Sequence, residues 1–372
     1  MQCRHFGSCG SCSVYNMSYD DQLVYKHERL EELMKDIYAG EIDLFSSPDE
    51  ANRARAEFRI WHDGDECSYA MSDISGNGVC PIDECPKVLK PISDIMKPLM
   101  EAINSSRELS KKLFGVEFMA STEGECILSM LYHRRLEDEW LSHATSLSES
   151  LGCNIIGRSR KQKVLTGNEY ITQKIVLGDR EYIYRYYDGA FIQPNPYINR
   201  SMLQWVVERL SSVSQGDLLE AYCGLGNFTL PLSSVSRKVL ATEVSKSSIK
   251  AAKENKILNN IKNIEFARLS SEELTEAIQR RRRFRRLEGI DLDGYDFESV
   301  LVDPPRAGLD DATLSLASNL DNIVYISCNP LTLSRDLKKF SSTHYVVSMA
   351  LFDQFPYTSH MECGAFLRRK HS

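Results

Sequence analysis

The sequence predicts an α/β protein with two domains, in which an α+β domain precedes a doubly wound parallel sheet. Its 372 residues suit roughly two domains. Short segments of alternating apolar and polar residues fill the first half, whereas continuous apolar runs alternate with helix-like stretches after about residue 190. Alternation indicates antiparallel strands, and continuous apolar strands indicate a parallel sheet that is buried on both faces.

The first 50 residues are predicted to form a cysteine cluster followed by a helix. Residues 18–38 carry apolar side chains at helical spacing, and Ser18 precedes them as a possible N-cap. Residues 51–190 form the predicted α+β domain, with strand-like segments at 56–61 and 126–132.

Residues 191–372 are predicted to form the parallel-sheet domain. Each apolar run there is followed by a stretch that is compatible with a helix, such as residues 245–252. The expected strands are residues 218–222, 239–243, 299–303 and 322–326.

Composition excludes several classes of protein. The chain is 42% hydrophobic and 26% charged, so it is neither disordered nor collagen-like. No apolar run approaches about 18 residues, and no secretory signal opens the sequence, so we expect a soluble cytoplasmic protein without a membrane partner. The net charge of −7 disfavours a general polyanion binder, and the expected cytosolic location argues against a disulfide framework for the eleven cysteines.

The first predicted strand of the parallel sheet ends in a glycine-rich turn. Gly224 and Gly226 allow a tight turn and a close approach to a ligand, but Thr229 replaces the third glycine of a dinucleotide fingerprint. Glu243 ends the second strand, where its carboxylate can accept hydrogen bonds from both ribose hydroxyls. A nucleoside without a pyrophosphate fits these residues better than NAD, so S-adenosylmethionine is the predicted cofactor and a nicotinamide oxidoreductase is disfavoured.

A thiol and two carboxylates follow later strands of the same sheet. Asp303 starts an acid-Pro-Pro turn, Cys328 follows the fifth strand, and Glu362 lies farther along the chain. In amino-group methyltransferases an aromatic residue follows the two prolines, whereas this chain has Arg306. Methylation of uracil C5 requires a thiolate that adds to C6 and a base that removes the C5 proton. Cys328 and Glu362 are the candidates for these two roles.

Taken together, these residues resemble the RNA 5-methyluridine methyltransferases, and most closely the tRNA (uracil-54-C5)-methyltransferase branch. The resemblance extends over nearly everything from Arg53 onward. The runs that are typical of that branch are residues 55–64, 289–292 and 350–358.

The resemblance implies a Rossmann-like S-adenosylmethionine-dependent methyltransferase domain over residues 191–372 and an RNA-binding domain over residues 51–190. It implies a flipped T-loop uridine 54 as the substrate, Cys328 as the nucleophile and Glu362 as the proton acceptor. The implied cofactor contacts are Gln193, Tyr222, Asn227, Glu243 and Asp303.

The N-terminal cysteines form a candidate metal site. Cys3, Cys9 and Cys12 supply three thiolates, and either Cys85 or Cys80 supplies the fourth. Spacing alone leaves structural zinc and an iron-sulfur cluster equally open. Sister enzymes that methylate 23S rRNA have an N-terminal cysteine set of this kind with a [4Fe-4S] cluster. That resemblance favours iron-sulfur, with Cys85 returning to the cluster.

The cysteines also keep other functions open. One alternative is the same reaction on 23S rRNA, and another is a non-catalytic iron-sulfur RNA-binding protein.

Residues 280–286 include six arginines that are either phosphate contacts or a solvated stretch balanced by nearby glutamates. A second basic stretch lies at residues 158–163. We expect tRNA rather than DNA as partner, and a monomer.

Overall fold

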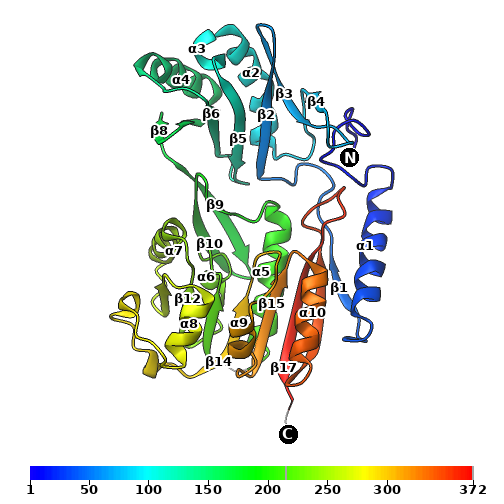
Figure 1. Cartoon of the computed structure of the whole chain (residues 1–372), viewed down its shortest axis with the longest axis vertical. Coiled ribbons are helices and arrows are strands. Elements are labelled where there is room, and N and C mark those ends of the chain that lie inside the picture. The colour runs from blue at the N-terminus through cyan, green and yellow to red at the C-terminus, as the bar shows by residue number, and fades with distance from the viewer. Residues whose placement is uncertain (214–215, 371–372) are drawn as a thin grey trace.

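The computed structural model describes residues 1–213 and 216–370 and has two sheet-based parts, one above the other in Figure 1. The upper part is built on a seven-stranded sheet and the lower part on an eight-stranded sheet. Within the described residues, no helix combines the length and apolarity that crossing a membrane requires.

The upper sheet is antiparallel except at one pair of strands. Its order is β4-β3-β2-β5-β6-β7-β8, and only β6 and β7 run parallel, because helix α4 connects them. The strands are β2 (Arg55–Asp63), β3 (Glu66–Ser72), β4 (Val79–Ile82), β5 (Leu113–Ala120), β6 (Cys126–Tyr132), β7 (Asn154–Ser159) and β8 (Gln162–Leu165). The helices are α2 (Lys90–Ser105), α3 (Arg107–Ser110) and α4 (Asp138–Leu151). Buried residues alternate along β2, which confirms the predicted period of two.

The lower sheet has the order β1-β16-β17-β15-β14-β11-β12-β13. Its strands are β1 (Ile42–Phe45), β11 (Asp217–Ala221), β12 (Val239–Thr242), β13 (Ile264–Ala267), β14 (Phe297–Val302), β15 (Asn322–Ser327), β16 (His344–Phe352) and β17 (Glu362–Arg369). Strands β11 to β15 are mutually parallel, whereas β17 runs antiparallel between β15 and β16. The four strands predicted from the sequence are confirmed as β11, β12, β14 and β15.

Helices cover both faces of the lower sheet, so its central strands are buried on both sides. Consecutive strand residues belong to different cores: Leu218 and Leu301 pack on one face, and Leu219 and Val300 on the other. The helices of this part are α5 (Pro196–Ser211), α6 (Thr229–Leu232), α7 (Lys246–Leu258), α8 (Ser271–Ile278), α9 (Asp311–Ala317) and α10 (Pro330–Phe340). Two short 3₁₀ helices, Arg285–Leu287 and Leu292–Gly294, precede β14. The predicted α/β class with a Rossmann-like sheet is therefore confirmed.

The N-terminal segment also packs on the lower part. The predicted helix is confirmed as α1 (Tyr19–Met34), and the Ser18 side chain accepts a hydrogen bond from the Asp21 amide as its N-cap. Strand β1 pairs in parallel with β16 and forms the edge of the lower sheet. In Figure 1, α1 runs alongside this sheet next to α10.

A two-stranded hairpin, β9 (Tyr170–Leu177) and β10 (Arg180–Tyr187), connects the two parts. Asn255 of α7 and Asn259 at the end of that helix accept hydrogen bonds from backbone amides of β10, each at 2.8 Å. The boundaries at residues 50 and 190 stay predictions, and the structure shows contacts across both of them.

Candidate active site

A cavity of about 1200 Å³ opens at the carboxyl ends of β11, β12, β14 and β15 and extends to the upper sheet. This is the edge of a parallel sheet where ligands bind in doubly wound folds. Both predicted catalytic residues, five of the seven predicted cofactor residues and all four predicted metal ligands line it. These are Cys328, Glu362, Gln193, Tyr222, Gly224, Glu243, Asp303, Cys3, Cys9, Cys12 and Cys85.

The Cys328 turn connects β15 to α10 and is fixed by its neighbours. The Ser327 hydroxyl donates to the Asn329 carbonyl at 3.1 Å, and the Asn329 side chain caps α10 by accepting from the Leu331 amide. The side-chain nitrogen of Asn329 also donates to the Arg306 carbonyl at 3.0 Å. Since one asparagine binds both turns, the thiol and the Arg306 turn are held at a fixed separation.

The acid-Pro-Pro turn that follows β14 carries Asp303 and Arg306 into the same cavity. It ends at Gly308, whose φ is +78° and whose amide donates to the Pro305 carbonyl at 2.9 Å. A Cβ atom at Gly308 would lie 2.6 Å from the side chains of Arg335 and Asp336, so only glycine fits this turn.

Two carboxyl groups and the thiol lie in one electrostatic environment. Burial and the neighbouring Asp303 raise the pKa of Glu362 well above its ordinary value, while Arg306 opposes the shift. Burial also raises the pKa of Asp303. The pKa of the Cys328 thiol is raised by burial and by the two carboxyl groups, and Arg306 lowers it. Arg306 is therefore the cation that favours the ionised forms of both Cys328 and Glu362.

The part of the cavity that is predicted to hold the cofactor contains Glu243. Its two carboxylate oxygens accept hydrogen bonds from the Gly224 amide at 3.2 Å and the Ser245 amide at 2.8 Å. Tyr222 has a left-handed φ of 64°, and its hydroxyl donates to Asp310 at 3.2 Å. The Gly224 and Ser245 amides thus orient the Glu243 carboxylate, which its predicted role as a ribose-binding residue requires.

Two of the predicted cofactor residues lie behind the cavity wall. The side-chain amide of Asn227 pairs reciprocally with that of Asn199, at 2.8 and 3.0 Å. Gly226 has φ +88°, and a Cβ atom there would lie 2.8 Å from a methyl group of Leu230. Both residues shape the turn from behind, and neither is among the residues that line the cavity.

The four cysteines predicted as metal ligands gather at one end of the same cavity, each as a free thiol. Burial raises the pKa of Cys12 to about 11. The nearby thiols of Cys85, Cys9 and Cys3 contribute to this rise. Among the described residues, however, no three cysteine, histidine or acidic side chains are close enough together to hold a metal ion. The competing ligand Cys80 is buried, and its thiol donates to the Pro81 carbonyl.

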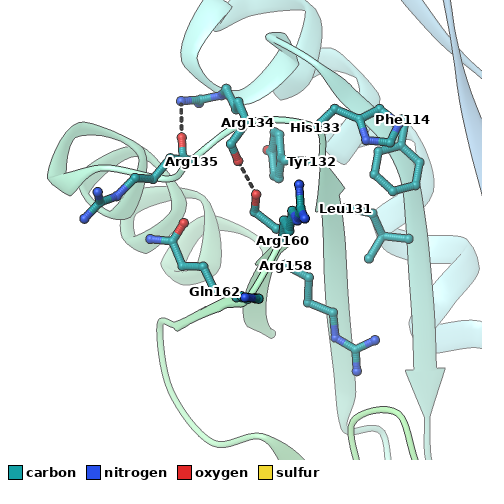
Figure 2. A pocket seen from close by; sticks show the side chains of 11 residues that line it. Phe114, Leu131, Tyr132, His133, Arg134, Arg135, Arg158, Arg160 and Gln162 are labelled. Carbon is teal, nitrogen blue, oxygen red and sulfur yellow. Dashed lines mark hydrogen bonds between the residues drawn. The ribbon is translucent and has the colours of Figure 1, made fainter.

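A second pocket, of about 850 Å³, lies on the upper part between β5, β6 and the β7–β8 turn (Figure 2). The rings of Phe114 and His133 stack at its edge, with centroids 4.0 Å apart and planes inclined by 13°. Arg134 and Arg158 are engaged in ion pairs with acidic residues, whereas Arg160 and Lys161 form none with any described residue. The pocket therefore combines exposed aromatic rings with uncompensated positive charge.

The arginine run at residues 280–286 lies elsewhere, after α8. Arg280 pairs with Asp293, Arg282 with Glu276 and Arg286 with Glu273, while the remaining arginines of the run are exposed. Part of this positive charge is therefore balanced by neighbouring acidic residues, as expected if the run is a solvated stretch.

Sequence reasoning missed several residues of the cavity. It gave no role to Arg306, although the position directly after two prolines at a strand end was a signal. It also gave none to His360, which lines the cavity two residues before Glu362. Nor could it place Lys87, whose buried ammonium group contacts a segment far away in the sequence.

Comparisons with known proteins show the family of the chain. A family model described as tRNA (Uracil-5-)-methyltransferase matches residues 18–370. A protein of a Sulfurovum species is 54% identical over 371 residues, which is 100% of both chains. A protein of a Nitratiruptor species is 50% identical over 99% of this chain and 100% of its own. Both relatives are named tRNA/tmRNA (uracil-C(5))-methyltransferase.

A solved structure shares the fold. The tRNA (uracil-54, C5)-methyltransferase of Pyrococcus abyssi, in complex with S-adenosyl-L-homocysteine, superposes with a TM-score of 0.72 at 23% identity. The match covers 96% of this chain and 86% of that protein.

Proposed function

Because the chain belongs to the tRNA (uracil-5-)-methyltransferase family, we propose that it transfers the methyl group of S-adenosylmethionine to C5 of a uracil in tRNA, at uridine 54 of the T-loop. The observation that carries the proposal is the convergence of Cys328, Glu362, Asp303 and Arg306 on the cavity that also contains Glu243. A thiol, a carboxyl group and a cation beside a nucleoside site are what C5 methylation requires.

The Cys328 thiolate attacks C6, and the electron pair of the C5–C6 bond forms an enolate. C5 of the enolate then takes the methyl group, and the donor leaves as S-adenosylhomocysteine. Glu362 removes the C5 proton, the double bond re-forms, and the sulfur–C6 bond breaks to release Cys328. The target base must leave its stack to expose C6, and the cavity provides the space for it.

The proposed donor site uses the residues at the strand ends. Glu243 binds the ribose hydroxyls, while Gln193, Tyr222, Gly224 and Asp303 contact the rest of the donor. Asn227 and Gly226 support the turn from behind, since the Asn227 amide is already paired with Asn199. Burial raises the pKa of Asp303, and a cationic ligand beside this carboxyl group would lower that pKa again.

The pocket in Figure 2 is the proposed tRNA contact outside the cavity. Stacked aromatic rings and unpaired cations are the groups that bind unstacked bases and phosphates of RNA. Phe114 is stacked on His133 and is still 40% exposed, so its ring remains accessible to a base. The site lies on the upper part, as the predicted RNA-binding role of residues 51–190 requires.

The direct test of this function is methylation with a labelled donor. We expect unmodified tRNA transcripts to be labelled and 23S rRNA transcripts of equal concentration to remain unlabelled. Phe114→Ala should raise KM for tRNA without changing KM for the donor. Phe191 is also exposed, but it lines the cavity, so Phe191→Ala would alter the cavity and not the pocket in Figure 2. Labelling of the 23S rRNA transcript alone would contradict tRNA as the substrate and support 23S rRNA.

A dependence of turnover on pH is also expected. The base must be ionised, and the Glu362 and Cys328 pKa values are both raised, so turnover should increase with pH through the neutral range. An exposed glutamate, by contrast, would be fully ionised above about pH 6. Single-turnover rates measured across the pH range test this, and a profile that stays flat down to about pH 5 would contradict it. Arg306→Gln should move the acidic limb to higher pH.

The predicted [4Fe-4S] cluster on Cys3, Cys9, Cys12 and Cys85 stays a prediction, with structural zinc as its alternative. The buried positive charges near these cysteines support a site that holds a metal. The ammonium group of Lys87 is buried near Cys12 and Cys85, and the half-buried Arg53 is also near both. Among the described residues, neither cation forms an ion pair with a carboxylate. Buried cations require compensating negative charge, which metal-bound thiolates would supply.

Anaerobic purification, metal analysis and a visible spectrum decide between the two metals. Brown protein with about four irons per chain would support the cluster. Colourless protein with stoichiometric zinc would support the alternative, and metal-free active protein would exclude both. The cytoplasmic location and the monomeric state also stay predictions.

A further inference from the structure

The loop of residues 353–361, between β16 and β17, leads directly into Glu362. Phe355, Thr358 and His360 of this loop line the cavity, so its conformation shapes the wall next to the proposed base. Tyr357 has φ +62°, a left-handed conformation that non-glycine residues adopt only when surrounding contacts impose it. The contacts that impose it come from distant parts of the chain.

Helix α1 supplies the central contact through Lys26. The Lys26 ammonium group donates to Asp353 at 2.6 Å and to the Phe355 carbonyl at 3.0 Å. Lys26 and Asp353 are each only 1% exposed and lie 327 residues apart in sequence. The Tyr19 hydroxyl donates to the other carboxylate oxygen of Asp353 at 2.7 Å.

Gln22, one helical turn before Lys26, supplies a second contact. Its side-chain oxygen accepts a hydrogen bond from the Tyr357 amide at 2.8 Å, and its side chain is 1% exposed. Elsewhere, the Lys87 ammonium group donates to the Pro356 carbonyl at 2.7 Å, and the Val14 amide to the Tyr357 carbonyl at 3.1 Å. Backbone groups of residues 355, 356 and 357 are therefore all bound by segments outside the loop.

These contacts are stronger constraints than surface hydrogen bonds. A buried ammonium group must keep its partners, because water cannot replace them. Lys26 has one carboxylate and one carbonyl partner, so the loop cannot shift without leaving a buried charge unpaired. Proton transfer depends steeply on distance, and a displacement of about 1 Å at the reacting groups costs about 100-fold in rate.

We propose that Gln22 and Lys26 of helix α1 are positioning residues for proton removal, because they fix the loop that presents Glu362 to the substrate. This inference rests on the proposed methyltransferase function and assigns a role to a helix that carries no residue of the cavity wall. The step that depends on it is the last one, in which the C5 proton leaves and the sulfur–C6 bond breaks.

The test compares Gln22→Met and Lys26→Met with Lys35→Met, in which the replaced lysine caps the same helix but is exposed. Both buried variants should reduce steady-state turnover about tenfold or more, while single-turnover methyl transfer and KM for the donor stay within about twofold. The covalent tRNA–enzyme adduct should therefore accumulate on a denaturing gel. Lys35→Met should match the wild type in each measurement.

Gln22→Met introduces no unpaired charge, so it carries the test if Lys26→Met fails to fold. The double variant Lys26→Met/Asp353→Leu removes both buried charges and should fold, yet still accumulate adduct. Hydrogen exchange of residues 355–362 should increase in the buried variants and not in Lys35→Met. Wild-type kinetics in folded Gln22→Met and in the double variant would overturn the inference. A wild-type protein that methylates no tRNA would instead overturn the proposed function.

Discussion

Replacing Cys328 with alanine is expected to abolish methyl transfer while tRNA and donor binding persist. Uracil C5 is a weak nucleophile until a thiolate has added to C6, so loss of the Cys328 sulfur removes the step that activates C5. We expect the single-turnover rate to fall by at least about 10³-fold. Transfer of label from the donor to tRNA measures the rate, and equilibrium binding measures the two affinities.

The matched control is Cys153→Ala, which removes a thiol that is buried in the core of the upper part. It should methylate tRNA at close to the wild-type rate, after correction for any loss of stability. Substantial methylation by Cys328→Ala would eliminate covalent catalysis, and loss of donor binding would show that Cys328 is needed for the shape of the pocket.

Replacing Glu362 with glutamine is expected to trap the enzyme on its RNA. The amide cannot accept the C5 proton, so methylation proceeds through one turnover and the sulfur–C6 bond then persists. Turnover should fall by at least about 10²-fold, and a methylated enzyme–tRNA adduct should accumulate in proportion to the enzyme present. Denaturing electrophoresis with labelled methyl donor detects that adduct directly.

Glu265→Gln, an exposed substitution in β13, is the matched control and should leave no adduct. The double variant Cys328→Ala/Glu362→Gln should also leave none, because the adduct requires the thiol. If Glu362→Gln turns over normally without an adduct, a different group removes the proton, and Asp303, whose charge influences Glu362, is the candidate carboxyl group.

Sequence reasoning could bring the proposed nucleophile Cys328 and the predicted cofactor residue Asp303 to one cavity because both lie where buried strands end. Cys328 and Asp303 each follow a strand that the apolar runs mark clearly, and parallel strands bring their carboxyl ends to one edge. Glu362 is different, since it begins a strand that runs antiparallel to its neighbours. The chemistry of C5 methylation and the family resemblance, rather than local pattern, identified it.

Other features could not be predicted locally. Asn227 lies in the glycine turn, but its side-chain amide is paired with that of Asn199 in helix α5. Strand β1 has only four residues, and its partner β16 is near the far end of the chain. The pairing of Lys26 with Asp353 is equally distant. In each case the deciding partner lies outside any sequence window that periodicity can cover.

Strand β1 also has a consequence for biosynthesis. It lies at the outer edge of the lower sheet, and within the described parts of the chain it pairs only with β16, whose residues are translated after β11 to β15. During synthesis, β1 leaves the ribosome early and lacks its partner strand until the last strands emerge. Such a high contact order slows the final folding step and exposes an aggregation-prone edge in the meantime. Nascent chains stalled before residue 344 should therefore depend on chaperones more than the complete chain does.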